Sequence, residues 1–116
     1  MRKIDTLKKN YEFENVLSKG KFYKGKYVII YLQRNNKQKN IIGIAISKKI
    51  GKANKRNKLK RLIRESYRLQ KENLQKGFNI VFIWNKKSDI TDINYNKINE
   101  DIINLLKIAR IYKWKK

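Results

Sequence analysis

Residues 55–68 read KRNKLKRLIRESYR, a stretch that joins dense positive charge to side chains that normally lie in a protein core. Seven of its fourteen residues are Lys or Arg. On an α-helix, which advances about 100° per residue, the two kinds of side chain separate into two stripes. The apolar stripe contains Leu59, Leu62, Ile63, Ser66 and Leu69. This separation predicts a helix over about residues 54–75 that packs its apolar stripe against a core.

The opposite stripe of this helix is almost entirely basic. It contains Asn57, Lys60, Arg61, Arg64, Arg68 and Lys71. Like charges one turn apart destabilise an isolated helix by about 0.2–0.5 kcal/mol per pair, and only Glu65 and Glu72 are available along the helix to offset them. Arginine suits phosphate groups because its guanidinium donates two parallel hydrogen bonds. The stripe therefore favours binding of a polyanion over the alternative, a merely solvated helix face.

The segment SKKIGKAN (47–54), just before this helix, adds positive charge at its start. The lysines around the helix N-terminus are Lys48, Lys49, Lys52 and Lys55. The first backbone N–H groups of a helix have no partner within the helix, and the helix dipole is positive at that end. Both properties attract phosphate, so the segment and the basic stripe predict the same kind of ligand.

The composition of the whole chain favours the same class of ligand. Its 116 residues fit one domain, residues 1–116, and 41% of them are hydrophobic, which is enough for a small core. The 31 Lys and Arg against nine Asp and Glu give a formal net charge of +22, which favours nucleic acid as the partner. An anionic membrane is the second candidate, but no apolar run is long enough to span one. The N-terminus lacks the features of a signal peptide, so we expect a cytoplasmic protein.

The residue types also limit the chemistry that the chain can perform. It has no His and no Cys, which excludes disulfides, Ser–His and Cys–His nucleophilic pairs and the usual zinc sites. Two-metal nuclease sites need several convergent carboxylates. The nine acidic residues are instead scattered: Asp5, Glu12, Glu14, Glu65, Glu72, Asp89, Asp92, Glu100 and Asp101. We therefore expect no catalytic residue and no metal ligand in the protein itself.

Hydrophobic periodicity and turn residues predict three helices and about four strands. The helices are expected over residues 10–19, about 54–75 and about 95–112, and the strands over residues 21–23, 26–33, 41–47 and 78–84. Asn10 and Asn94 are the expected N-caps of the first and last helices. The order helix, strands, helix, strand, helix predicts an α/β sandwich of the α+β kind, with helices packed on a sheet of about four strands and residues 86–93 as a loop.

The strand IIGIAIS (41–47) has two different faces. Because side chains alternate along a strand, Ile42, Ile44 and Ile46 lie on one face and Gly43, Ala45 and Ser47 on the other. The isoleucine face is typical of a core. The face with small side chains leaves room for another segment or a ligand to approach the sheet.

The segment SKKIGKANKRNKLKRLIRESYR (47–68) resembles the signature of the protein subunit of bacterial ribonuclease P. The matching positions are Lys48, Lys49, Gly51, Ala53, Arg56, Asn57, Lys60, Arg61 and Arg64, with Arg68 extending the stripe. The first predicted helix, with LKKNYEFENVLSKG (7–20), and the IYK near the C-terminus also resemble this family, so the likeness covers nearly the whole chain.

The resemblance implies that the chain is an accessory subunit of a ribonucleoprotein endoribonuclease. In this family the protein binds a large catalytic RNA, and the two together remove the 5′ leader of precursor tRNA. The RNA supplies the active site and holds the Mg2+, which agrees with the residue types that are missing here. The resemblance implies that the catalytic RNA is bound by Lys48, Lys49, Lys52, Ala53, Arg56, Asn57, Lys60, Arg61, Arg64 and Arg68.

The family also binds the leader in a cleft between the first helix and the sheet. Carried over by position, and with the residues on the same strand faces added, this cleft contains Phe13, Leu17, Ile29, Tyr31, Ala45 and Ser47. An extended single strand would bind there by stacking and by a basic groove. Many family members have an aromatic residue at the position of Leu17, so here the resemblance implies an apolar contact instead. The alternative for Phe13 and Leu17 is that both pack beneath the helix.

The resemblance further implies a left-handed strand–helix–strand crossover around the signature helix, whereas general rules favour a right-handed one. Two other classes of protein remain open on composition alone. A non-catalytic basic binding protein, such as a ribosomal protein or a nucleoid DNA binder, would have the same charge. A metal-dependent nuclease is disfavoured because the acidic residues are few and dispersed.

Overall fold

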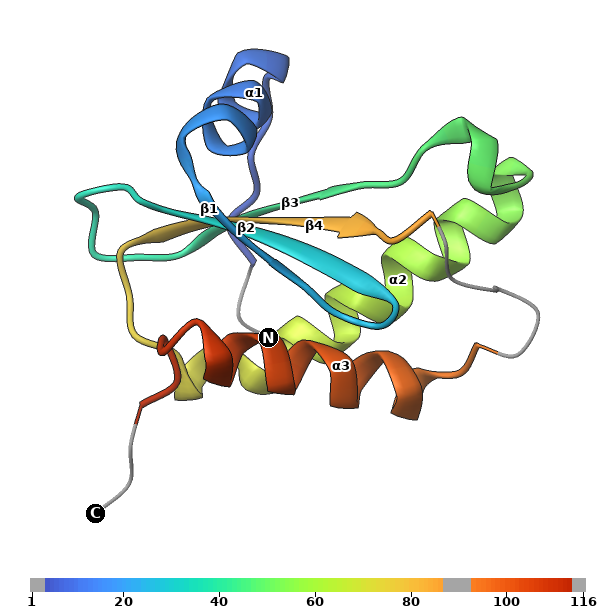
Figure 1. Ribbon diagram of the computed structural model, residues 1–116. Helices are drawn as coiled ribbons and strands as arrows, with labels where there is room; N and C mark the ends of the chain where they lie inside the picture. The colour runs from blue at the N-terminus through green and yellow to red at the C-terminus, as the bar shows by residue number, and fades with distance from the viewer. Residues whose placement is uncertain (1–3, 87–92, 114–116) are drawn as a thin grey trace.

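The computed structural model describes residues 4–86 and 93–113, so the loop predicted over 86–93 lies mostly outside the described residues. Its elements are α1 (Asn10–Lys19), β1 (Lys21–Lys24), β2 (Val28–Arg34), β3 (Ile41–Ala45), η1 (Lys48–Ile50), α2 (Ala53–Gln70), η2 (Lys71–Asn73), β4 (Phe78–Trp84) and α3 (Tyr95–Ile108). The four strands form one sheet, with α1 on one face and both α2 and α3 on the other (Figure 1). The predicted α+β sandwich and its order of elements are confirmed.

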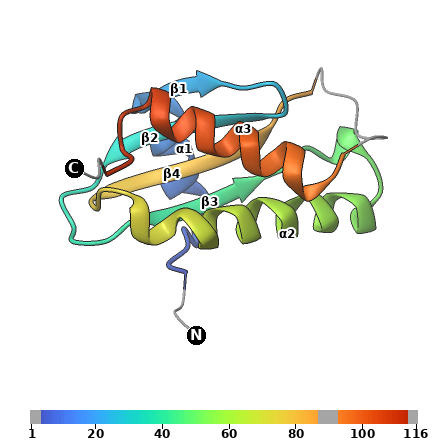
Figure 2. The same ribbon diagram turned by 90° about the horizontal axis from the view of Figure 1, so that it is seen from below.

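The strand order in the sheet is β1-β2-β4-β3, so the FNIVFIW strand lies inside the sheet. Strand β4 is antiparallel to β2 and parallel to β3. In Figure 2, β3 and β4 both point to the right, α2 lies on the viewer's side of the sheet, and β4 lies above β3. The crossover from β3 through α2 to β4 is therefore left-handed, as the resemblance implied and contrary to the general rule.

The main core lies between the sheet and the layer of α2 and α3. Helix α2 buries Leu59, Leu62 and Ile63 in it, as predicted. The prediction is wrong for Leu69, which is 66% exposed, whereas Tyr67 is only 1% exposed. These two residues lie at opposite edges of the apolar stripe, each about 80° from Leu59. The sheet covers only the Tyr67 edge, where the Tyr67 ring meets the Phe82 ring edge-on at 6.1 Å.

Helix α1 packs on the opposite face of the sheet over a smaller cluster, which is formed by Leu7, Val16, Ile41 and Val81. Gly43 lies directly beneath Phe13. A Cβ atom on Gly43 would lie 2.5 Å from the Phe13 ring, a distance at which one of the two must move. The small-residue face of β3 therefore admits the Phe13 ring. The alternative considered for Phe13, packing beneath the helix, applies in part because the residue is half-buried there.

The ends of the helices differ from the predicted ends where other contacts replace the expected ones. The N-cap of α1 is Lys9 rather than Asn10, because the Glu12 carboxylate accepts the N–H groups of Lys8 (3.1 Å) and Lys9 (2.9 Å). The N-cap of α3 is Asn94, as predicted, and its side chain accepts the N–H of Lys97 at 3.0 Å.

The last helix is shorter than predicted. It ends at Ile108, and Arg110 adopts a left-handed backbone conformation with φ 62°. The chain reverses there, so that Ile111 returns to the core with 2% exposure and accepts a hydrogen bond from the N–H of Gln75 at 2.7 Å. Tyr112 therefore does not continue the apolar face of α3. Its hydroxyl donates to the Gln70 side chain at the end of α2.

Asp101 of α3 holds the turn between β1 and β2. Its carboxylate accepts the backbone N–H groups of Lys26 (3.0 Å), Tyr27 (2.9 Å) and Val28 (2.9 Å). The turn approaches so closely that a Cβ atom on Gly25 would lie 2.5 Å from this carboxylate. Strand β2 begins at Val28 rather than at the predicted residue 26, because Asp101 takes the N–H groups that precede it. One acidic side chain thus connects the last helix to the first hairpin.

The buried Tyr67 hydroxyl makes stability depend on alkaline pH. It has no hydrogen-bond partner among the described residues. Burial raises the pKa of Tyr67 to about 12, and the negative charges of Asp5 and Glu72 add to the shift. An unfolded tyrosine ionises near pH 10. Between about pH 10 and 12 the unfolded chain therefore loses a proton that the folded chain keeps, and the free energy of unfolding falls as pH rises.

The Tyr67→Phe variant is expected to be at least as stable as the parent at pH 7, because it removes a buried hydroxyl without a partner. Between pH 10 and 12 its free energy of unfolding should gain about 2–3 kcal/mol relative to the parent, the equivalent of a pKa difference of about two units. Urea unfolding of both proteins from pH 7 to pH 12 measures this difference. If the free energies of unfolding of the two proteins changed equally with pH above pH 10, the raised pKa of Tyr67 would not be the cause of the alkaline loss of stability.

Candidate nucleic-acid interface

The basic stripe of α2 faces solvent along the whole helix. Asn57, Arg61, Arg64 and Arg68 are exposed and Lys60 is half-buried, while the apolar residues of the same helix lie in the core. Within the part of the chain that the structure describes, no ion pair joins Arg61, Arg64 or Arg68 to a carboxylate. Their charges are therefore available to a ligand. The stripe and the core separate as the helical spacing predicts.

The turn before α2 adds exposed cations at the start of the helix. The side chains of Lys48, Lys49 and Lys52 are exposed, and so is Ala53 at the first position of α2. Lys52 is the N-cap of α2 and supplies no side-chain hydrogen bond to the helix end. The Oδ1 of Asn54 accepts the N–H of Lys55 at 2.9 Å, so one of the first N–H groups has a side-chain partner. The positive end of the helix dipole still favours a phosphate ligand.

Arg56 and Ser47 shape this turn. Arg56 is half-buried, and its Nη1 donates to the carbonyl oxygen of Gly51 at 3.1 Å. The hydroxyl of Ser47 accepts the N–H of Lys49 at 3.2 Å and caps η1. Both residues have structural contacts in addition to the binding roles predicted for them. They position the lysines between β3 and α2.

A second surface lies on the α1 face of the sheet, in the row beside the helix. The strand register places Ile29 of β2, Ile83 of β4 and Ala45 of β3 next to one another in this row. All three are half-buried, whereas Val81 and Gly43 in the row beneath α1 are buried. The predicted residues Ile29 and Ala45 are therefore brought together with Ile83. The surface formed by Ile29, Ile83 and Ala45 is called the open row below.

Aromatic and aliphatic side chains border the open row. Tyr31 is half-buried in the neighbouring row, and its ring lies 5.8 Å, centroid to centroid, from the ring of Phe22. Phe22 is 62% exposed and Leu17 of α1 is 36% exposed. Sequence reasoning missed Phe22 and Ile83. The strand alternation that selected Tyr31 would have found Ile83, but Phe22 becomes visible only through the pairing of β1 with β2.

The two surfaces meet at one end of β3. Ala45 lies in the open row, and Ser47, two residues further on, caps the basic turn that leads into α2. A ligand that lies on the open row would therefore come close to the lysines of the turn. The predicted cleft residues and the predicted basic residues form neighbouring surfaces.

The acidic side chains of the described residues do not form a metal-binding cluster. Residues 4–86 and 93–113 contain no group of three or more acidic side chains that could hold a metal ion. The carboxylates of Asp101 and Glu12 already accept hydrogen bonds from backbone N–H groups.

Within residues 4–86 and 93–113, the helices lack the combination of length and hydrophobicity that a bilayer-spanning segment requires.

The left-handed β3–α2–β4 unit and the cationic surface of α2 define a small basic α+β protein of the kind that binds RNA. A family model described as Ribonuclease P matches residues 1–110. The ribonuclease P protein component of Clostridium botulinum (strain Langeland / NCTC 10281 / Type F) is 43% identical over 111 residues, which are 95% of this chain and 98% of that protein. That of Caldanaerobacter subterraneus subsp. tengcongensis is 39% identical over 113 residues, 97% of this chain and 96% of that one.

Solved structures agree with this family. The RNase P protein of Staphylococcus aureus superimposes with a TM-score of 0.84 at 29% identity, over 96% of this chain and all of that one. The RNase P protein of Thermotoga maritima superimposes with a TM-score of 0.81 at 33% identity, over 92% of this chain and 97% of that one. The chain belongs to the ribonuclease P protein family. Its activity is that of an accessory subunit of a ribonucleoprotein endoribonuclease, with RNA binding and precursor-tRNA processing.

Proposed function

We propose that the chain acts as a single RNA-binding domain whose two neighbouring surfaces hold two different RNAs. The basic turn and the stripe of α2 bind the catalytic RNA of ribonuclease P. The open row, with Phe13, Leu17, Tyr31 and Ser47 around it, binds the 5′ leader of precursor tRNA. The proposal is supported chiefly by the stripe itself, because its arginines are exposed and unpaired in the described structure.

The character of the open row supports a single-stranded ligand. Half-buried aliphatic side chains and two rings, those of Tyr31 and Phe22, offer flat apolar contacts to bases or riboses. Lys24 is exposed at the β1 end of the same row, opposite Ile29, and the basic turn lies at the β3 end. Cations at both ends of an apolar row suit an extended strand, whose phosphates then lie at the sides.

The catalytic groups belong to the RNA in this proposal. The Mg2+ that the reaction requires is held mainly by the RNA, in keeping with the dispersed acidic residues of this chain. The protein contributes positive charge and position: it lowers the repulsion between two polyanions and fixes the leader relative to the RNA. We place this complex in the cytoplasm, with no membrane and no small-molecule substrate as a partner.

A reconstitution experiment tests this function. Mixed with a bacterial ribonuclease P RNA, the chain should restore cleavage of precursor tRNA at a low Mg2+ concentration at which the RNA alone is inactive, because protein cations replace part of the metal-ion screening. Cleavage is measured as release of the labelled 5′ leader, with nuclease-treated protein alone as the control. A basic protein that binds RNA without this function, such as a ribosomal protein, would give no rescue. Cleavage by the protein alone would show a catalytic site in the chain itself.

A further inference from the structure

A groove of about 630 Å³ opens on the side of α1 that carries its polar residues, away from Phe13. It is lined by Tyr11, Glu12, Glu14, Asn15 and Ser18 of α1 and by Asn79 of β4. Asn79 lies on the same face of β4 as Val81, two residues before it. It pairs with Gln33 of β2 and Ile41 of β3, so the groove lies one row away from the row beneath the helix. Because Ile83 lies two positions to the other side of Val81, α1 separates this groove from the open row.

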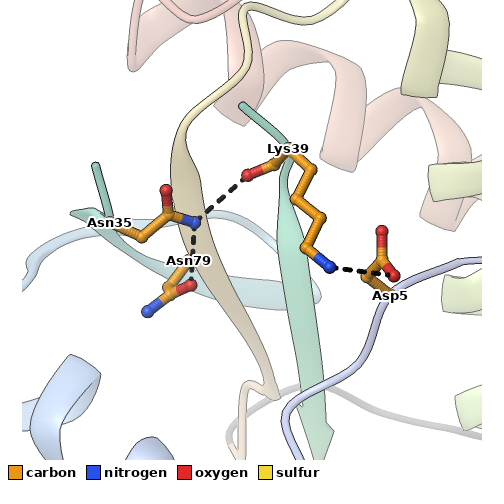
Figure 3. Close-up of polar contacts among 4 residues, drawn as sticks. All are labelled: Asp5, Asn35, Lys39 and Asn79. Carbon is orange, nitrogen blue, oxygen red and sulfur yellow. Dashed lines mark hydrogen bonds and ion pairs between the residues drawn. The ribbon is translucent and has the colours of Figure 1, made fainter. Parts of the chain in front are cut away.

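A chain of hydrogen bonds orients the amide of Asn79 on the groove floor. The Oδ1 of Asn35 accepts the N–H of Lys37 at 2.8 Å, so the Nδ2 of Asn35 is the atom that donates to Asn79 Oδ1 (3.1 Å) and to the Lys39 carbonyl (3.2 Å). Figure 3 shows the oxygen of Asn79 turned toward Asn35 and its nitrogen pointing away. The groove thus receives the NH2 group of Asn79, a donor whose direction is set before any ligand binds.

The charges around the groove disfavour a phosphate on its floor. Glu12 and Glu14 line it, and hydrogen bonds from the N–H groups of Lys8 and Lys9, together with the charges of Lys37 and Lys9, lower the pKa of Glu12. A carboxylate that stays ionised repels an anion beside it. The cations Lys9 and Lys37 lie close enough to Glu12 to act on it, so they supply positive charge near the groove.

The exposed ring of Tyr11 adds a stacking surface. Tyr11 is 66% exposed although it is a large aromatic residue, and the Nζ of Lys9 lies 5.8 Å from the centre of its ring. The aromatic ring can stack on the face of a nucleobase, and the oriented donor and the acidic acceptors can bind its edge. The nearby lysines can bind the phosphates on either side of that base.

We propose that this groove is a second nucleotide-binding site, in which a base of single-stranded RNA stacks on Tyr11 and accepts a hydrogen bond from Asn79 Nδ2. The proposal rests on the RNA-binding role given above, but it concerns a surface on the other side of α1. A base with a carbonyl or ring-nitrogen acceptor on its exposed edge is the expected occupant. We expect this base to belong to a single strand, because a base in a duplex has its faces covered by the bases stacked on it.

The Asn79→Asp variant of the full chain tests the donor. It keeps an oxygen that accepts from Asn35 and replaces the presented NH2 by a repulsive carboxylate oxygen. The affinity of this groove is read from the backbone 15N signals of Asn15 and Ser18 while an eight-nucleotide single-stranded RNA is added, so that RNA bound at the open row does not contribute. Binding at the groove should be about tenfold weaker than for the parent, equivalent to one lost hydrogen bond of about 1.4 kcal/mol. Asn96→Asp, an exposed position on α3, makes the same change of charge on the opposite face of the sheet and should weaken binding less than twofold.

A second variant tests the stacking surface. Tyr11→Ala removes an exposed ring without loss of core packing and should also weaken binding about tenfold, because a stacked base contributes about 1–3 kcal/mol. In a 15N-labelled chain, the RNA should shift the side-chain NH2 signal of Asn79, and inorganic phosphate should not. Equal effects of Asn79→Asp and Asn96→Asp, or an equal shift with phosphate, would overturn the proposal. If instead the reconstituted cleavage failed, the proposed function would fall, whatever these two variants showed.

Discussion

Replacing Arg61 and Arg64 together by alanine is expected to weaken binding of the catalytic RNA by roughly a hundredfold or more. Both side chains are exposed on the basic stripe of α2, one turn apart, and no carboxylate neutralises either of them in the described structure. Hydrogen bonds between charged groups contribute about 1.5–3 kcal/mol each, so the loss of two predicts this reduction. The slope of log affinity against log salt concentration should fall by about two, because two fewer counterions are released.

Two controls distinguish specific contacts from net charge. The double variant Lys58→Ala/Lys113→Ala removes two exposed charges that lie off the stripe, and it should change the affinity far less. Arg61→Lys/Arg64→Lys keeps the charge and loses the bidentate fork, so the salt slope should be retained while the affinity falls in part. Filter binding or anisotropy from 50 to 400 mM salt (about one decade) measures both quantities. A salt slope that is unchanged in the alanine double variant would assign the stripe to a solvated helix face.

The variant Asp101→Ala is expected to lower the free energy of unfolding by about 3 kcal/mol or more. It leaves the N–H groups of Lys26, Tyr27 and Val28 without the acceptor that lies 2.9–3.0 Å away in the native structure. A buried or half-buried donor that loses its partner costs about 1–3 kcal/mol. Three donors lose their acceptor here, and water can replace it only at the exposed Lys26. Asp101→Asn should also destabilise, because its NH2 group would face donors.

Urea unfolding measures the effect as a shift of the midpoint without a change of the m-value. Glu100→Ala is the matched control, since it removes the same charge from the adjacent, exposed position of α3. In a chain of net charge +22, the loss of any acid carries some cost, and this control separates that cost from the loss of the clamp. Equal destabilisation by Asp101→Ala and Glu100→Ala would contradict the role assigned to Asp101.

The parts of the fold that could be predicted are those with a local cause. Helical spacing separates Leu59 and Ile63 from Arg61 and Arg64 without knowledge of the tertiary structure, and strand alternation does the same for the two faces of β3. The left-handed crossover had no such cause and came only from the resemblance. The burial of Tyr67 in place of Leu69 could not be predicted, because it depends on how the sheet lies across α2.

The contacts that lay beyond prediction join residues far apart in the sequence. Nothing near Asp101 indicates that its carboxylate binds a turn about 75 residues earlier, and in the sequence it is one dispersed acid among nine. The same holds for the chain reversal at Arg110, which depends on the place of Ile111 in the core. In the candidate interface, Phe22 was missed because its position beside Tyr31 follows from strand pairing, not from spacing.

The strand order β1-β2-β4-β3 has a consequence for how the chain folds as it is synthesised. Strand β3 forms a bridge to Thr6 through Ile42, but it has no neighbouring strand in the sheet until β4 is made. Strand β2 lacks one of its two neighbours until the same point. Asp101 completes the first hairpin only when the last helix has formed. Such long-range pairing slows folding, because distant segments must meet before any contact compensates for the lost entropy. We therefore expect the nascent chain to stay open until nearly all of it has left the ribosome, and then to fold as one cooperative unit.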